Sequence, residues 1–251
     1  MIQSVDRALY ILDILKNNPR GLGVTEIAGR LEVAKSTAHR LLASLEEHGY
    51  VQKVGKEANY RLGLKFIEMN QVVVENLNVV ELARPYLEQL SSATGEIVHL
   101  VMLDGYEIVY IDKVDNSSTI RIYSQIGRRA QLHCTGVGKA ILAYYDDTRI
   151  NEFIKNNDFR SYTENTITDG QALLQELKYI RESGISYDKE EHEPGIQCVA
   201  APIKDHQNNV QYAISVTGPL TRMTQEKLKE CIPKLKETVN HISRQLGYRF
   251  S

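Results

Sequence analysis

The chain lacks tryptophan and has only three cysteines and six prolines among its 251 residues. It also lacks long apolar runs: no segment approaches the ~20 apolar residues that a membrane-spanning helix needs, so we expect no contact with a membrane. Its first residues do not show the basic and then apolar order of a signal peptide, which predicts a cytoplasmic protein. The widely spaced Cys134, Cys198 and Cys231 fit reduced thiols better than a disulfide framework.

Net charge is also small, because 30 basic residues are balanced by 32 acidic ones, yet its distribution along the chain is uneven. Up to Phe66, ten basic residues stand against seven acidic ones, so this part carries +3 and the remainder −5 of the whole-chain −2. We therefore expect a small domain that can face DNA, joined to a larger acidic domain with another task.

The first fifty residues predict three short helices. Apolar residues recur at helical spacing from Val5 onward, with Ser4 as a candidate N-cap. A second helix starts near Thr25, and a third begins at Lys35 and ends at Gly49. Two short helices joined by a tight turn, the second with small polar and basic residues at its start, are the arrangement that reads the major groove of DNA.

A predicted hairpin follows the third helix directly, with a polar tip at Gly55–Asn59, and such a hairpin is the wing of a winged helix-turn-helix. Basic residues on a wing lie along phosphates, where they add affinity but little sequence information. The predicted DNA-binding residues are Lys35, Ser36, Thr37, His39 and Arg40 on the helix, and Lys53, Lys56 and Arg61 on the wing.

Two alternatives stay open for this segment. Ser36 and Thr37 could equally cap the helix, and Arg40 could pair with Glu46 or with another surface acid. Helix-turn-helix shapes also serve as ordinary packing units, in which case the segment would bind no DNA.

The rest of the chain predicts an α+β domain on an antiparallel sheet. Adjacent strand-like runs around short turns, with helices segregated from them, favour this class over a Rossmann layout. The expected helices are 64–77, 79–94, 136–145, 170–183 and 225–246, and the expected strands are 97–103, 108–114, 120–123, 197–203 and 210–216.

The run Gly136–Ala140 invites comparison with a phosphate-binding loop. A Walker motif would need glycine at His133 and serine or threonine at Ala140, which excludes nucleotide hydrolysis. Glycines at the start of a helix then indicate close backbone packing or an anion site made by free amides and the helix dipole. We expect no cofactor.

Several motifs occur in a fixed order: Gln3–Leu9, Thr25–Ala28, Lys35–Leu42, Tyr60–Gly63, His133–Ala140, Tyr187–Ile203 and Ala213–Pro219. Together they closely resemble the IclR family of bacterial transcription regulators, over nearly the whole chain. The resemblance implies a winged helix-turn-helix at 1–63, a linker helix at 64–78 that contributes to dimer contacts, and a GAF/PAS-like effector-binding domain at 79–251.

The resemblance also implies an effector site for a small carboxylate such as a keto acid or a sugar acid. The implied effector-binding residues, matched by motif position, are Ile122, Gly136, Val137, Asp188, Cys198, Ser215 and Thr217. We expect a repressor of a metabolic operon that binds palindromic double-stranded operator DNA as a homodimer or a dimer of dimers.

Structural explanations exist for the same residues. Cys198 could be packed in the core, Ser215 and Thr217 could mark one face of a strand, and Asp188 could be a surface acid.

A different function is an enzyme with a DNA-binding appendage, in which Cys134 or Cys198 is the nucleophile and His133 or His192 the base. These residues could also gather with His99 into a metal site, but none shows the close spacing of a zinc motif. We find no nucleophile elbow or cofactor fingerprint, and expect no catalytic activity and no metal.

Overall fold

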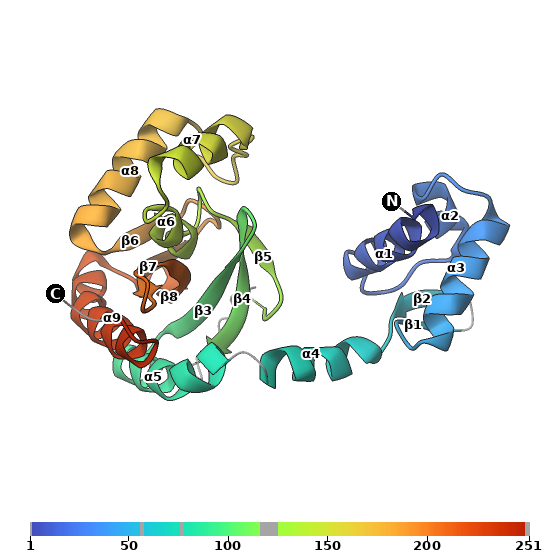
Figure 1. Cartoon of the computed structure of the whole chain (residues 1–251), viewed down its shortest axis with the longest axis horizontal. Coiled ribbons are helices and arrows are strands. Elements are labelled where there is room, and N and C mark those ends of the chain that lie inside the picture. Colours follow the sequence, from blue (N-terminus) through green and yellow to red (C-terminus); the bar gives the residue numbers. More distant parts are fainter. Residues whose placement is uncertain (1, 56–57, 76–77, 116–124, 249–251) are drawn as a thin grey trace. The chain divides into compact units, whose positions relative to one another are not determined.

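The structure is a computed structural model that describes residues 2–55, 58–75, 78–115 and 125–248 (Figure 1). The chain forms two compact units, Met1–Leu77 and Asn78–Ser251. Within the described ranges, no helix combines the length and the apolar character needed to cross a membrane. Lys56, Ile122 and the strand expected at 120–123 lie outside the described residues.

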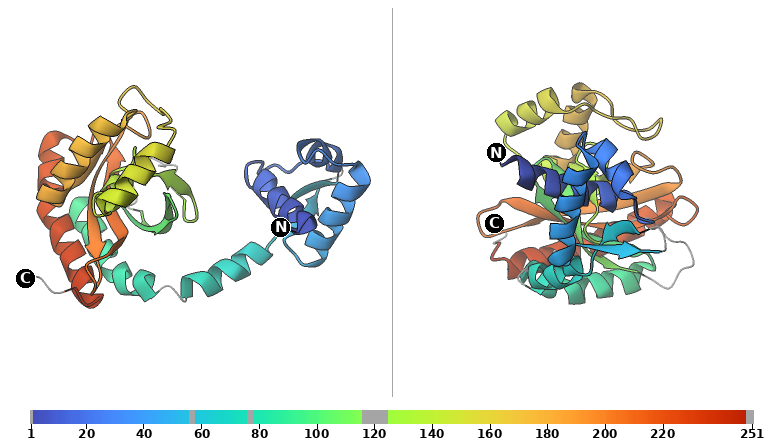
Figure 2. Two further views of the ribbon diagram at one scale, coloured as in Figure 1. Left: turned by 45° about the horizontal axis from the view of Figure 1, so that its top comes forward. Right: turned by 90° about the vertical axis from the view of Figure 1, so that its right-hand side faces the viewer.

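The N-terminal unit is a helix-turn-helix followed by a two-stranded hairpin, which confirms the predicted winged helix-turn-helix (Figures 1 and 2). The hairpin is antiparallel and pairs Val51 with Leu62 and Val54 with Asn59. In chain order the elements are α1 (Gln3–Lys16), α2 (Val24–Arg30), α3 (Lys35–Glu47), β1 (Val51–Val54), β2 (Asn59–Leu62) and α4 (Lys65–Glu75).

A small apolar core holds this unit together. Ile11 of α1, Ile27 of α2 and Leu42 of α3 are fully buried in one apolar cluster between the three helices. Tyr60 of β2 joins them, and its backbone pairs with that of Leu22 in the segment between α1 and α2. Because burying one such side chain stabilises the fold by about 1.5–3 kcal/mol, the helices and the hairpin hold each other in place.

The candidate N-cap Ser4 is wrong, and the alternative role of Ser36 and Thr37 as caps is not observed. α1 begins before Ser4, which therefore lies inside the helix and does not cap it. α3 begins after Ala34, so that Ser36 and Thr37 lie in its first turn and neither is the N-cap. At the other end Gly49 follows α3 with a φ of 77°, the left-handed conformation that favours glycine after a helix, as predicted.

The C-terminal unit contains, among its described residues, a six-stranded sheet in the order β5-β4-β3-β8-β7-β6. Neighbouring strands are antiparallel throughout, which confirms the predicted α+β class. Its elements are α5 (Asn78–Thr94), β3 (Ile97–Asp104), β4 (Glu107–Val114), β5 (Arg129–Gln131), α6 (Gly136–Leu142), α7 (Asp147–Asn156), α8 (Gly170–Ser183), β6 (Ser186–Lys189), β7 (Ile196–Lys204), β8 (Val210–Pro219) and α9 (Gln225–Gln245).

The helices of this unit divide between the two faces of the sheet. α5 and α9 pack on each other and on one face, whereas α6 lies on the other face with α8 against it (Figures 1 and 2). Every residue of α6 is buried, because the sheet lies on one side of the helix and α8 lies against another. The start of α6 approaches β6 and β7 closely, and this approach creates the site described next.

Candidate DNA-binding surface and effector pocket

The predicted DNA contacts on α3 occupy one exposed stretch at its start. Lys35, Ser36, His39 and Arg40 are exposed and Thr37 is half-buried, while Ala38 and Leu42 are buried in the core. α3 thus presents small polar and basic side chains to solvent, which a helix that enters the major groove requires.

On the hairpin, the two described basic residues of the predicted set, Lys53 and Arg61, are both exposed. Lys53 Nζ lies 2.8 Å from an Oε of Glu46 on α3. Glu46 therefore pairs with the wing, and the pairing with Arg40 considered from the sequence is not observed. The hydrogen bond to Glu46 raises the pKa of Lys53, but an exposed pair of this kind contributes little to stability.

In the C-terminal unit, one cavity of about 40 Å³ gathers the described residues that the family resemblance implied. Space of this size holds a few water-sized groups. Hollows of about 360 and 280 Å³ elsewhere on this unit contain none of these residues, so the small cavity is distinguished by the residues that line it and not by its size. The implied residues that line it are Gly136, Val137, Asp188, Cys198, Ser215 and Thr217.

The register of the sheet explains how one wall of the pocket forms. Asp188 on β6 pairs with Cys198 on β7, which pairs in turn with Thr217 on β8. His99 on β3 pairs with Ser215 on β8. Directly opposed residues of antiparallel neighbours project from the same face of a sheet. Three consecutive strands, β6, β7 and β8, and the distant strand β3 thus place these side chains side by side.

The start of α6 forms the opposite wall. Gly136 is required there, because a Cβ would lie 2.6 Å from Cys198 Sγ and 3.3 Å from the backbone nitrogen of Asp188. Thr135 caps the helix by accepting a hydrogen bond of 3.1 Å from a first-turn amide. The amides of Gly136 and Val137 belong to the first turn, whose N–H groups have no acceptor within the helix and suit an anion.

Asp188 supplies a buried carboxyl group whose ionisation depends on its neighbours. Its Oδ1 accepts hydrogen bonds from the backbone N–H groups of Glu191 at 2.7 Å and of His192 at 3.4 Å. Burial, followed by the nearby charge of Glu191, raises the pKa of Asp188 to about 7. Near neutral pH the protonated form is therefore populated, and this form can donate a hydrogen bond to a ligand carboxylate.

His99 is a pocket residue that sequence reasoning did not assign to the effector. Its Nδ1 lies 3.3 Å from Ser215 Oγ and 3.2 Å from Thr217 Oγ1, and these two hydroxyls are 3.1 Å apart. Burial lowers the pKa of His99 to about 3, so the ring stays neutral and helps to orient the hydroxyls. Its edge-on contact with Tyr110, at 5.2 Å, holds the ring in place.

Arg128 and Glu193 form the partly exposed side of the same pocket. Their side chains lie 3.5 Å apart, which places an ion pair beside the cavity. Sequence reasoning missed both: Arg128 lies outside the motifs, and Glu193, although it lies within Tyr187–Ile203, was not among the residues that the resemblance implied.

The cysteines lack the environment of a nucleophile. Burial raises the pKa of Cys134 to about 12 and also raises that of Cys198, whereas a reactive thiol needs a lowered pKa. His133 Nε2 donates to the Arg160 carbonyl at 3.1 Å, and its Nδ1 lies 3.2 Å from the amide nitrogen of Asn157. In the part of the chain that the structure describes, no three His, Cys, Asp or Glu residues could hold a metal ion.

Comparisons with known proteins cover both units. A model of the IclR helix-turn-helix domain matches residues 4–55, and a model of the C-terminal part of bacterial transcriptional regulator IclR matches residues 71–244. The HTH-type transcriptional regulator XynR of Escherichia coli (strain K12) is 36% identical, over 99% of this chain and 98% of its own. The DNA-binding transcriptional repressor YiaJ of the same organism is 34% identical, over 98% of this chain and 88% of its own.

Solved structures of similar proteins match nearly the whole length of this chain. The crystal structure of the Thermotoga maritima IclR is 37% identical, covers 99% of this chain and 100% of that chain, and has a TM-score of 0.80. An IclR transcriptional regulator from Alicyclobacillus acidocaldarius is 28% identical and has a TM-score of 0.85, over 97% of this chain and 98% of that chain.

Proposed function

Because this chain belongs to the IclR family of bacterial transcriptional regulators, which are DNA-binding proteins and not enzymes, we propose that it represses a metabolic operon and responds to a small carboxylate. Repression is supported by relatives that are themselves named repressors, such as YiaJ and AllR. A bacterial transcription regulator acts in the cytoplasm, where its DNA lies.

The observation that carries the sensing role is the convergence of polar groups in one pocket. Two helix amides, two hydroxyls and a carboxyl group that retains a proton near neutral pH all reach the cavity beside Arg128. This mixture suits a ligand that has both a carboxylate and a keto or hydroxyl oxygen. The pocket volume of about 40 Å³ favours a short-chain acid, whereas a six-carbon sugar acid would require the pocket to open.

The exposed start of α3 and the exposed basic residues of the hairpin support the DNA-binding proposal. In this proposal Lys35, Ser36, Thr37, His39 and Arg40 contact base edges, and Lys53 and Arg61, with Lys56 at the tip, contact phosphates. For the effector to act, its affinity must differ between the DNA-competent and DNA-incompetent states of the protein.

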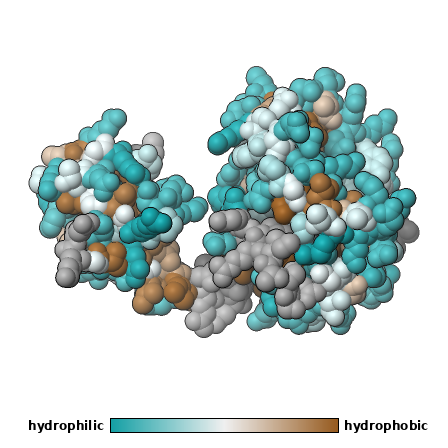
Figure 3. All heavy atoms as spheres, turned by 180° about the vertical axis from the view of Figure 1, so that it is seen from behind, coloured by the Kyte–Doolittle hydropathy of each residue, from teal (hydrophilic) through white to brown (hydrophobic). Residues whose placement is uncertain are grey.

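Two exposed apolar helix faces support a homodimer or a dimer of dimers. Large apolar side chains of α1, of Ile2 just before it and of the segment that contains α4 are half or more exposed, and hydrophobic residues gather over the α4 segment (Figure 3). Contiguous exposed apolar surface commonly marks an interface. We propose that residues 64–78 link the two domains and join α1 in the dimer contact. The exposed residues are Ile2, Val5, Leu9, Leu64, Ile67 and Val72.

A thermal-shift experiment tests the sensing role. The full chain, Ser215→Ala and the control Ser243→Ala are each heated with pyruvate, glyoxylate or D-gluconate. Ser243 is a matched control because it is also buried but accepts its hydrogen bond from Lys204. We expect one acid at saturation to raise the Tm by about 5 °C. Loss of one hydrogen bond in Ser215→Ala should weaken that acid about tenfold, and Ser243→Ala should not.

Two outcomes would contradict the proposal. Equal binding by the Ser215→Ala variant would show that the ligand occupies another place. Absence of stabilisation by all three acids, at concentrations that saturate ordinary sites, would contradict a carboxylate sensor.

A further inference from the structure

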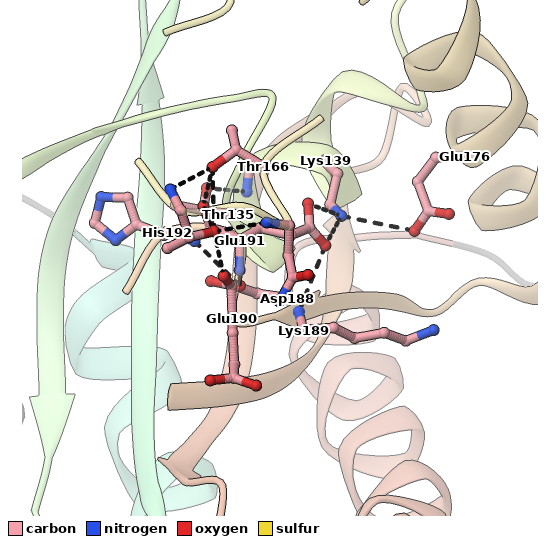
Figure 4. A network of polar contacts seen from close by, with 12 residues as sticks. Thr135, Lys139, Thr166, Glu176, Asp188, Lys189, Glu190, Glu191 and His192 are labelled. Carbon is pink, nitrogen blue, oxygen red and sulfur yellow. Dashed lines mark hydrogen bonds and ion pairs between the residues drawn. The ribbon is translucent and has the colours of Figure 1, made fainter. Parts of the chain in front are cut away.

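Lys139 is a fully buried lysine in the middle of α6, and it lies beside the pocket (Figure 4). Its Nζ lies 2.5 and 2.6 Å from the two carboxylate oxygens of Glu191, and 3.7 Å from Glu176 on α8. Neither Lys139 nor Glu191 is among the described residues that line the cavity. A buried ion pair is therefore placed next to the pocket without opening into it.

Glu191 belongs to the turn that follows β6. Its N–H donates to Asp188 Oδ1 at 2.7 Å, and its carbonyl accepts a hydrogen bond of 2.6 Å from the Thr166 hydroxyl. The preceding residue, Glu190, has a φ of 60°, a left-handed conformation that is uncommon outside glycine. The carbonyl of Glu190 in turn accepts a hydrogen bond of 2.6 Å from Thr163. The turn is thus held in a sparsely populated conformation by side chains on both sides.

We propose that Lys139 and Glu191 are a positioning pair for the effector pocket, which holds the turn whose N–H groups bind the carboxyl group of Asp188, while neither residue of the pair touches the ligand. The inference rests on the proposed function of the pocket. Stability alone does not explain the pair, because replacing a buried ion pair by apolar residues of similar volume is often neutral or stabilising. An apolar pair would fill the same space but would not fix the direction of the Glu191 backbone.

The charges of the pair also act on Asp188. The ionisable groups around Asp188 are Lys139 on α6, Glu191 and His192 on the turn, Cys198 on β7, Cys134 before α6 and Tyr110 on β4. The charge of Glu191 raises the pKa of Asp188, and the charge of Lys139 lowers it. The pair therefore keeps two opposite charges near this carboxyl group, and loss of one of them changes the pKa of Asp188.

Three variants of the full chain test the pair. Lys139→Met/Glu191→Met removes both charges and leaves no buried charge without a partner. Glu191→Gln keeps the size of Glu191 and one accepting oxygen but removes its charge and one of its two acceptors. The control is Glu96→Met/Arg222→Met. Glu96 is another buried carboxylate, and the Arg222 guanidinium contacts its two oxygens at 2.8 and 2.7 Å. Neither residue lines the pocket.

Two readouts need no ligand: hydrogen exchange at the amides of Glu191 and His192, and the NMR titration of the Asp188 carboxyl carbon. We expect the Lys139/Glu191 double variant to melt within about 5 °C of the parent. Its two amides should exchange at least tenfold faster, because Asp188 no longer meets an ordered turn. In Glu191→Gln, the titration midpoint of Asp188 should fall. The control variant should change neither readout.

Parent-like exchange in a folded double variant would overturn the proposal. If the double variant does not fold, Glu191→Gln decides: an unchanged Asp188 midpoint overturns the proposal, and a lowered midpoint supports it. Both readouts are made without ligand, so they do not depend on the thermal-shift screen. Failure of every acid in that screen would refute the effector role of the pocket, and the exchange and titration results would still test the role of the ion pair.

Discussion

The two units of this regulator assemble their functional residues in opposite ways. The candidate DNA contacts on α3 are near neighbours in the sequence, and nearly all of them are exposed. The pocket instead draws buried residues from β3, α6, β6, β7 and β8, and the contact between His99 and Thr217 spans 118 positions. A surface built from one helix can change without disturbing the fold, whereas a pocket built from many elements shares its side chains with the core.

Ion pairs show the same contrast. Lys53 and Glu46 pair on the surface with exposed fractions of 44% and 34%, so salt screens their attraction and either side chain can turn to another partner. The Lys139 and Glu191 side chains are only 1% and 8% exposed, and removal of one partner leaves a buried charge. The N-terminal pair is thus suited to exchange with phosphates, and the C-terminal pair to hold a shape.

The sharpest separation of the two units should come from the double variant Lys35→Ala/Arg40→Ala. We expect it to lose about 100-fold in DNA affinity, because each lost contact costs roughly 1–3 kcal/mol. The Tm should stay within about 2 °C, since both residues are exposed. Fluorescence anisotropy with a duplex selected from a random pool by the parent chain measures the affinity.

Lys155→Ala provides the charge control, because Lys155 is an exposed lysine on α7 of the other unit. It should bind the same duplex as the parent does. If Lys35→Ala/Arg40→Ala retains its affinity, α3 is not the recognition helix; if it melts much earlier, the surface is not independent of the core.

Gly136→Ala tests the close packing of the pocket. The added Cβ would lie 2.6 Å from Cys198 Sγ, so α6 or β7 must move, and we expect a loss of about 1–3 kcal/mol in the free energy of unfolding. Adding Cys198→Ala should restore part of this loss, and DNA affinity without effector should remain. Urea unfolding and the anisotropy assay measure the two properties.

Gly29→Ala is the matched control in the N-terminal unit, where a Cβ meets nothing within 4 Å. Because alanine favours the helix over glycine, this variant should be neutral or more stable by up to about 1 kcal/mol. Equal losses in Gly136→Ala and Gly29→Ala would remove the contrast between a packed pocket and an open surface.

The same contrast explains what the sequence could predict. Helical spacing, the stop at Gly49 and the polar hairpin tip are local signals, and the winged helix-turn-helix follows from them. The N-cap prediction failed at Ser4, because helix ends depend on one or two residues whose alternatives differ little in energy.

In the C-terminal unit, strand and helix periodicity predicted most elements, but α7 and the short strands β5 and β6 were missed. Their signals are weak, since a strand of three or four residues shows almost no alternation. The pocket required pairing between distant strands, so only motif resemblance could assemble it in advance. His99 was missed as a pocket residue because its role appears only when β3 pairs with β8.

The smallest expected effect concerns pH and the pocket alone. The pKa of Asp188 is raised to about 7 in the folded chain, while an unfolded aspartate titrates near ~3.9. Between these values the folded state retains a proton that the unfolded state has lost, so this group's contribution to stability falls as pH rises and levels off above about 7. Asp188→Asn removes that contribution but keeps an oxygen that can accept the bonds from the turn.

Relative to Asp188→Asn, the parent should lose about 1 kcal/mol in the free energy of unfolding between pH 6 and pH 7. Other titrating groups, such as Glu191 and His192, are present in both proteins, so their contributions largely cancel in the difference. Urea unfolding of both proteins at the two pH values measures this difference. DNA binding by both proteins shows whether the N-terminal unit is unaffected. Parallel pH profiles would mean that Asp188 is already ionised in the pocket. A ligand carboxylate would then meet a negative charge, and the amides of α6 and Arg128 would have to supply the attraction.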